Sequence, residues 1–130
     1  MSADNKVILI IDDDRFLLDM YSLKFKQQGF TVESSTSGQE ALTKLRDGLQ
    51  PMAILLDIVM PGLDGIEFMD AVKKESLAPN AMLIVLSNQG EEQDIEKAKT
   101  HGAHEYIVKA NSVPSEVLDK VMAAISRHTS

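Results

Sequence analysis

The chain has 130 residues, of which 44% are hydrophobic, a length and composition that suit one compact domain. Its 20 acidic residues outnumber 13 basic ones and give a formal net charge of -7, which argues against direct nucleic-acid binding. Because the chain has no cysteine, disulfides, thiolate catalysis and cysteine-bound zinc are excluded.

The first predicted element is a strand at Val7–Ile11, an apolar run typical of strands buried on both faces of a parallel sheet. This run is too short for a signal-peptide core or a membrane span, so we expect a cytoplasmic protein without membrane insertion. Asp14 then predicts the N-terminal cap of a helix that ends at Gly29. The apolar residues that this helix carries on one side are Phe16, Leu17, Met20 and Leu23.

A shorter and more mixed strand is predicted at Phe30–Glu33, nearer an edge of the sheet. Ser37 and Glu40 have the spacing of a capping box, which predicts a second helix. A buried strand follows at Met52–Leu56, and a second capping box that begins at Asp64 predicts a third helix. The apolar residues that follow these two caps are Ala41, Leu42 and Leu45, and Phe68, Met69 and Val72.

The last buried strand is predicted at Ala81–Leu86. A fourth helix begins near Glu91, where acidic residues favour the first turn, and ends near Gly102. An edge strand is predicted at Glu105–Val108, and a fifth helix carries Pro114 in its first turn. The apolar residues that this last helix packs are Val117, Leu118, Val121 and Ile125.

Strands and helices are thus expected to alternate five times. This predicts an α/β fold with a doubly wound, five-stranded parallel sheet of the flavodoxin-like type. The sequence has no internal repeat, so we expect one domain over residues 1–130. Because ligands of such sheets bind beyond the carboxyl ends of the strands, the residues directly after each strand are the candidates for a site.

Polar side chains follow four of the predicted strands. Asp12 and Asp13 follow the first strand, Asp57 the third, Ser87 the fourth and Lys109 the fifth. Carboxylates gathered at one edge repel and desolvate one another, so a site that holds three of them requires a cation. Such oxygen ligands suit Mg²⁺, which accepts one or two carboxylates together with a phosphoryl oxygen. The sequence therefore predicts a Mg²⁺ site at this edge of the sheet.

Four segments at these positions read ILIIDDD, AILLDIVMPGLDG, IVLSNQG and YIVKAN. Together, in this order and at these intervals, they resemble the response-regulator receiver domains of two-component signalling. The resemblance spans essentially the whole chain and implies a single receiver domain over residues 1–130. It also implies a CheY-like fold, in which the strands lie in the order 2-1-3-4-5.

The resemblance implies a role for each site residue. Asp57 would be the phosphoacceptor, and Ser87 and Lys109 would bind phosphoryl oxygens. Tyr106, together with Ser87, would form a switch. The residues that would hold Mg²⁺ are Asp12, Asp13, Asp57 and, through its backbone carbonyl, Val59.

The resemblance also implies the partners. The phosphoryl group would come from a sensor histidine kinase or a phosphotransfer protein. A protein target would be read through the face formed by the fourth helix, fifth strand and fifth helix. Such a chain would be a signalling switch that catalyses only its own phosphorylation and dephosphorylation.

The chain departs from the usual family pattern at two positions. Ala110 follows Lys109 where the family commonly has a proline in a cis peptide, and a cis bond before alanine costs about 3 to 4 kcal/mol. Asn88 is larger than the residue often found after the hydroxyl. Val59 and Gln89 are expected to flank the path of the water that attacks the acyl phosphate, and so to tune its lifetime.

Two other functions compete with this interpretation. In a haloacid-dehalogenase-like phosphatase, Asp12 would be the nucleophile and Asp14 the acid, but Asp57 would then have no role. A flavodoxin-like flavin binder would need a phosphate-binding loop after the first strand and a tryptophan to stack on the flavin. We find no such loop, and the sequence has no tryptophan. The chain could also be a receiver taken from a longer regulator. His101 and His104 have no third ligand nearby in the sequence and are interpreted as surface residues.

Overall fold

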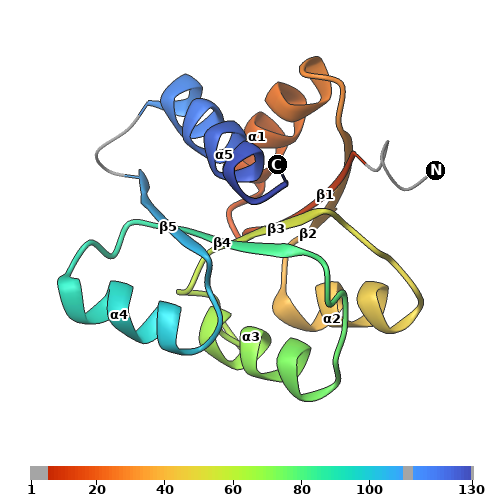
Figure 1. Ribbon diagram of the computed structural model, residues 1–130, viewed down its shortest axis with the longest axis vertical. Helices are drawn as coiled ribbons and strands as arrows, with labels where there is room; N and C mark the ends of the chain where they lie inside the picture. The colour runs from red at the N-terminus through yellow and green to blue at the C-terminus, as the bar shows by residue number, and fades with distance from the viewer. Residues whose placement is uncertain (1–5, 110–112, 130) are drawn as a thin grey trace.

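A computed structural model describes residues 6–109 and 113–129, and within them strands and helices alternate five times as predicted (Figure 1). The predicted departure at the Lys109 to Ala110 peptide therefore lies outside the described residues. The strands are β1 (Val7–Ile11), β2 (Thr31–Ser35), β3 (Ala53–Leu56), β4 (Met82–Ser87) and β5 (Glu105–Val108). The helices are α1 (Arg15–Gln27), α2 (Gly38–Arg46), α3 (Gly65–Lys74), α4 (Glu92–Thr100) and α5 (Pro114–Thr129).

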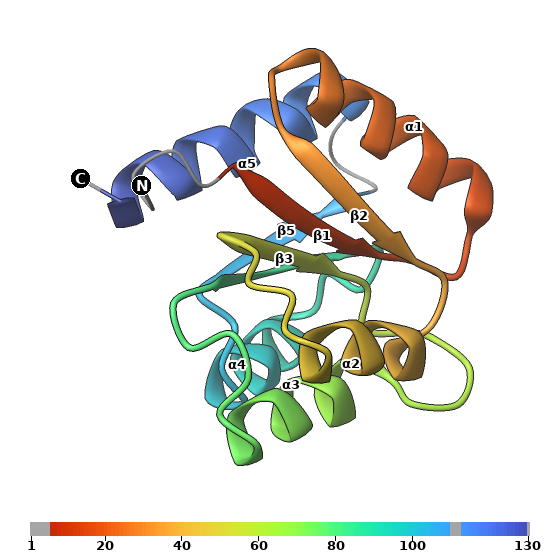
Figure 2. The ribbon, with the colours of Figure 1, turned by 90° about the vertical axis from the view of Figure 1, so that its right-hand side faces the viewer.

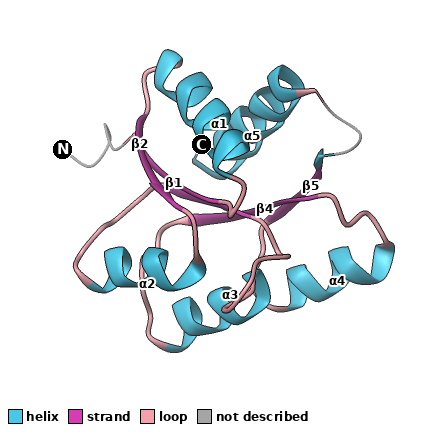
Figure 3. Cartoon of the chain, turned by 180° about the vertical axis from the view of Figure 1, so that it is seen from behind, coloured by secondary structure: helices cyan, strands magenta, loops and turns pink. Residues whose placement is uncertain are grey.

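The strands form one parallel sheet in the order β2-β1-β3-β4-β5, which confirms the predicted fold class and strand order. Helices α1 and α5 cover one face of the sheet, and α2, α3 and α4 cover the other (Figures 1, 2 and 3). Every connection is a helical crossover, so the carboxyl ends of all the strands lie along the same edge.

The core consists of two layers, one on each side of the sheet. Alternate residues of a strand point to opposite faces, so Leu9 and Ile11 pack toward α2 and α3, whereas Ile8 and Ile10 pack toward α1 and α5. Both layers are apolar, which explains why β1, β3 and β4 are continuous apolar runs. The apolar residues predicted for α2 and α3 are all buried.

The apolar side predicted for α1 only partly faces the core, because, of its four residues, Leu17 and Met20 alone pack against it, and both are half-buried. Phe16 and Leu23 are exposed, with 77% and 58% of their surface accessible. The residues that α1 buries are instead Leu18, Tyr21, Ser22 and Phe25. Both sets have helical spacing, so periodicity alone does not choose between them. The observed face buries two aromatic side chains and sets the Phe25 ring edge-on against Phe30, which removes more apolar area from water.

The predicted helix caps are largely confirmed. The Asp14 carboxylate accepts the backbone N–H groups of Phe16 and Leu17 at the start of α1. The capping box at Asp64 is complete. The box at Ser37 is only half formed, because the Glu40 carboxylate accepts from the N–H of Thr36 instead of Ser37.

The predicted bounds of β2 are wrong by one to two residues. The strand runs Thr31–Ser35 instead of Phe30–Glu33 because Ser34 and Ser35 continue the pairing with the end of β1. Phe30 belongs to the core instead.

Over the part of the chain that the structure describes, no helix combines the length and the apolarity needed to cross a membrane.

Candidate functional site

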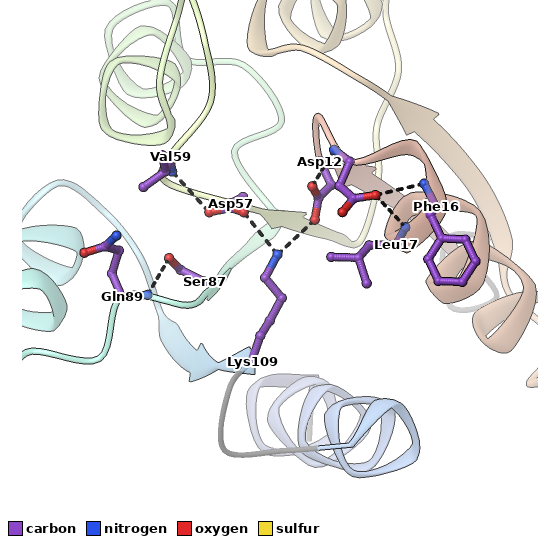
Figure 4. A network of polar contacts seen from close by, with 9 residues as sticks. Asp12, Phe16, Leu17, Asp57, Val59, Ser87, Gln89 and Lys109 are labelled. Carbon is purple, nitrogen blue, oxygen red and sulfur yellow. Dashed lines mark hydrogen bonds and ion pairs between the residues drawn. The ribbon is translucent and has the colours of Figure 1, made fainter.

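Three charged side chains meet at the carboxyl edge of the sheet (Figure 4). The Lys109 ammonium donates to Asp12 Oδ2 and to Asp57 Oδ2, each at 3.1 Å. Asp12 and Asp57 directly follow Ile11 and Leu56, which are paired residues of β1 and β3. Sheet register therefore sets the two carboxylates side by side, as the sequence predicted.

Burial and neighbouring charge act in opposite directions on Lys109 and Asp12. The Lys109 and Asp12 side chains are only 7% and 5% exposed, and that of Asp57 is 12% exposed. Burial alone would lower the pKa of Lys109, but the attraction of Asp57 and Asp12 and their hydrogen bonds outweigh it and raise that pKa. Burial raises the pKa of Asp12, against the opposing effects of the Asp14 N–H and the Lys109 charge. The ammonium is thus firmly held, whereas Asp12 bears a desolvation cost.

A third carboxylate leaves the cluster short of positive charge. Asp12, Asp13 and Asp57 each offer a carboxylate oxygen, and these atoms all lie within 4.8 Å of one another. Asp13 is exposed, and no hydrogen bond or ion pair of its side chain is seen among the described residues. Three carboxylate oxygens at this separation are a ligand set suited to Mg²⁺. The residues present therefore fit a divalent cation.

The loop after β3 approaches Asp57 closely at one position that the sequence did not single out as functional. The N–H of Gly65 donates to the Ile58 carbonyl at 2.9 Å. A Cβ on Gly65 would lie 2.6 Å from the Asp57 carbonyl oxygen and 2.7 Å from Ile58 Cα. Only glycine allows α3 to begin so close to the backbone of Asp57 and Ile58, and the spacing of residues in the sequence does not reveal such a contact.

Val59 lies beside Asp57, and its N–H donates to Asp57 Oδ1 at 3.1 Å. Its side chain is exposed, as is that of Gln89. Both residues therefore stand at the open side of the site (Figure 4). Coordination of a metal by the Val59 carbonyl stays a prediction.

The backbone of Gln89 connects the buried hydroxyl with the aromatic residue of β5. Ser87 is fully buried, and its Oγ accepts the N–H of Gln89 at 3.1 Å. The Tyr106 hydroxyl donates to the Gln89 carbonyl. Burial raises the pKa of the Tyr106 phenol, an effect that the nearby Ser87 hydroxyl opposes. Ser87 and Tyr106 are thus linked through one residue, a connection that sequence reasoning missed.

Tyr21 is a second residue that sequence reasoning missed. It is buried on the inner face of α1 and lines, with Asp12, Asp57 and Leu86, a narrow gap beneath the site. Burial raises the pKa of its phenol, and the charges of Lys109 and Asp12 act on it in opposite directions.

The Asp14 carboxylate does not belong to the cluster of Asp12, Asp13 and Asp57, because it caps α1.

Comparisons with known proteins point to one family. Residues 8–122 match the family model of the response regulator receiver domain. The DNA-binding response regulator MtrA of Mycobacterium tuberculosis is 31% identical over 128 residues, which cover 98% of this chain and 54% of that protein. The chain therefore spans about half the length of the curated relatives it matches.

Solved structures share the fold. A CheY-like receiver domain protein from Methanospirillum hungatei superposes with a TM-score of 0.83 at 26% identity, covering 95% of each chain. The CheX-CheY-BeF3-Mg+2 complex from Borrelia burgdorferi contains a chain with a TM-score of 0.80 and 30% identity, covering 90% of this chain and 87% of that one.

The shortage of positive charge predicts how Asp13→Ala behaves. In EDTA the variant should unfold at no lower temperature than the parent, because removing one of three crowded carboxylates relieves repulsion. With added MgCl₂ the parent should gain more thermal stability than the variant, because a ligand that binds only the folded state stabilises it by mass action.

Asp19→Ala, which removes an exposed acid of α1 outside the cluster, is the matched control and should respond to MgCl₂ as the parent does. An Asp13→Ala variant that melts earlier than the parent in EDTA would instead give Asp13 a structural role.

Proposed function

We propose that this chain, which belongs to the family of response regulator receiver domains, is a two-component signalling switch that takes a phosphoryl group onto Asp57. The observation that carries the proposal is the Asp57 carboxylate held beside the Lys109 ammonium, with two further carboxylates within reach. We infer that the donor is a sensor histidine kinase or a phosphotransfer protein. Relatives of the chain are response regulators, signalling proteins rather than conventional enzymes.

The proposed reaction is a direct displacement at phosphorus. An Asp57 oxygen forms a bond to the phosphorus of a phosphohistidine, the P–N bond breaks, and its electron pair stays on the imidazole of the donor. The product is an acyl phosphate. The Lys109 ammonium, already in contact with Asp57, neutralises charge on the phosphoryl oxygens, which it does as a compact point charge.

Magnesium would supply the remaining positive charge in this reaction. We propose that Asp12, Asp13, Asp57 and the Val59 carbonyl hold it. Lys109 would then lose its hydrogen bond to Asp12, keep its contact with Asp57 and bind the phosphoryl group. The desolvation cost that Asp12 bears favours such an exchange of one cation for another.

The haloacid-dehalogenase alternative finds no support in the geometry. It requires Asp14 as an acid, but the Asp14 carboxylate caps α1. It also requires Asp12 as the nucleophile, and Asp12 is almost fully buried against Lys109. We therefore do not propose a phosphatase.

We propose that the signal leaves through the face formed by α4, β5 and α5. Tyr106 of β5 contributes to this face and lines a hollow of about 380 Å³ with Lys120 and Arg127 of α5. A phosphoryl group that draws the Ser87 hydroxyl toward it would remove the acceptor of the Gln89 N–H. Gln89 also accepts from Tyr106, so the change would reach the outer face. Phosphorylation would thereby favour one of two conformations of the face formed by α4, β5 and α5.

We further propose that residues 1–130 form one receiver domain that works in the cytoplasm. The excess of acidic residues, 20 against 13, supports a protein target over direct contact with nucleic acid. The binding of DNA named for MtrA is a property of that longer protein.

The central test is Asp57→Asn. This variant should incorporate no phosphate from acetyl phosphate or a kinase, because an amide cannot form the acyl phosphate. Labelled protein after acid precipitation is the measurement, with circular dichroism to show that the variant folds. Asp19→Asn is the control and should label as the parent does. Undiminished, base-labile labelling of Asp57→Asn would refute the proposed function.

The link through Gln89 predicts that Ser87→Ala separates phosphorylation from the switch. With beryllofluoride and Mg²⁺ standing in for the phosphoryl group, the parent should shift its amide resonances in α4 and β5. Ser87→Ala should still bind beryllofluoride but lose most of the shift at Tyr106 and in α4. Ser34→Ala, on an exposed position of β2, serves as control. Full shifts in Ser87→Ala would exclude Ser87 from the switch.

The side chains at the open side of the site predict a long-lived phosphorylated state. Val59 has no polar side-chain atom, and Gln89 is a neutral amide and a poor proton acceptor, so neither activates the attacking water. Val59→Asn with Gln89→Glu should speed phosphate loss about tenfold, equivalent to about 1.4 kcal/mol of barrier. Decay of labelled protein in excess Mg²⁺, without kinase or phosphatase, measures this. Equal decay of variant and parent would mean that these side chains do not set the lifetime.

A further inference from the structure

Helix α1 places a hydroxyl group beside the charged site that the proposed reaction does not use. Tyr21, at the middle of α1, is buried, with only 3% of its surface accessible. Its side chain lines a gap together with Asp12, Asp57 and Leu86. The gap is too narrow to hold a water molecule, so a polar group that faces it depends on the lining side chains for hydrogen bonds.

Packing explains the ring of Tyr21 but not its hydroxyl. The ring belongs to the apolar layer between the sheet and helices α1 and α5, where a phenylalanine would fill the same space. The hydroxyl forms no hydrogen bond with any residue that the structure describes. It therefore keeps its full capacity for hydrogen bonding.

The charge with the largest effect on this hydroxyl is that of Lys109. It lowers the pKa of the Tyr21 phenol, but burial outweighs it and leaves that pKa raised. The group is therefore a neutral hydroxyl at pH 7 and can accept as well as donate a hydrogen bond.

The Lys109 ammonium also has hydrogen-bonding capacity left over. Of its three N–H groups, one donates to Asp12 and one to Asp57, each at 3.1 Å. The third forms no hydrogen bond among the described residues. A buried ammonium that loses an acceptor is costly in free energy unless another acceptor replaces it.

We propose that Tyr21 is a positioning residue for Lys109, and that its hydroxyl accepts a hydrogen bond from the ammonium once Asp12 serves as a ligand of Mg²⁺. The inference rests on the proposed function, in which Lys109 loses its hydrogen bond to Asp12. Because no water fits in the gap, the Tyr21 hydroxyl is the group placed to replace that carboxylate. The hydroxyl would thus stabilise the form with Mg²⁺ bound and keep the ammonium beside Asp57.

Tyr21→Phe tests this role, because it removes the hydroxyl and keeps the ring. In EDTA the variant should melt at no lower temperature than the parent, since it loses no hydrogen bond to a described residue. In a titration of the full ¹⁵N-labelled chain with MgCl₂, followed by amide shifts, it should bind Mg²⁺ about tenfold more weakly.

Ser22→Ala is the matched control. It removes a second buried hydroxyl without a hydrogen-bond partner, from the next position of α1, and Ser22 does not line the gap. This variant should bind Mg²⁺ as the parent does.

The ¹⁵Nζ resonance of Lys109 reports the contact directly. Tyr21→Phe should shift this resonance in MgCl₂ and leave it nearly unchanged in EDTA, whereas a structural role would change it under both conditions. Earlier melting of Tyr21→Phe in EDTA, a loss of Mg²⁺ affinity below about twofold, or an equal loss in Ser22→Ala would overturn the inference.

Labelling of Asp57 by acetyl phosphate, measured on the parent in parallel, separates the two possible failures. A parent that labels at Asp57 but binds Mg²⁺ no more tightly than Tyr21→Phe would refute the role of Tyr21 alone. A parent that neither binds Mg²⁺ nor labels would refute the proposed function, and this inference with it.

Discussion

The contact of one ammonium with two carboxylates at the carboxyl edge of the sheet is the interaction on which the site depends. Lys109 reaches Asp12 and Asp57 at equal distances and is itself almost fully buried. Two acidic groups so close together, beside a third, would otherwise repel one another. The apolar strands on either side keep water away, which strengthens this attraction and also makes any uncompensated charge costly. The same arrangement that holds the site together therefore leaves it receptive to further positive charge.

Sheet geometry delivers these groups, and the loops refine their positions. Parallel register sets the ends of β1, β3, β4 and β5 along one edge, so that residues far apart in the chain meet there. The close approach at Gly65 and the capping box at Asp64 fix where α3 begins, and so fix the loop that carries Val59. Asp14 ends the acidic run after β1 by capping α1, which separates the cap from the cluster.

The fold and the charged residues of the site could be predicted because strong local signals specify them. Continuous apolar runs indicate doubly covered strands, and the residues after them are forced to one edge. The buried face of α1 could not be predicted, because Phe16 and Leu23 have the same spacing as residues that the helix buries. Tyr21, Gly65 and the backbone of Gln89 were missed for a related reason. Their roles depend on contacts between distant segments, which composition and spacing do not encode.

Helix α4 follows β4, the strand whose carboxyl end lies in the site. Strand β4 has Ser87 at its carboxyl end, in the site, and Leu83 near its amino end, where the Leu83 N–H donates to His104 Nδ1. The helix that follows β4 buries only Ala98, a small side chain, so the apolar area that holds it is small and so is the free energy gained from burial. The ion pair of His101 with Asp70 is partly exposed and adds little. Elements with few buried contacts are those that move at low cost in free energy. Among the residues that the structure describes, α4 buries the fewest side chains of any of these helices, and it directly follows the strand that ends at Ser87.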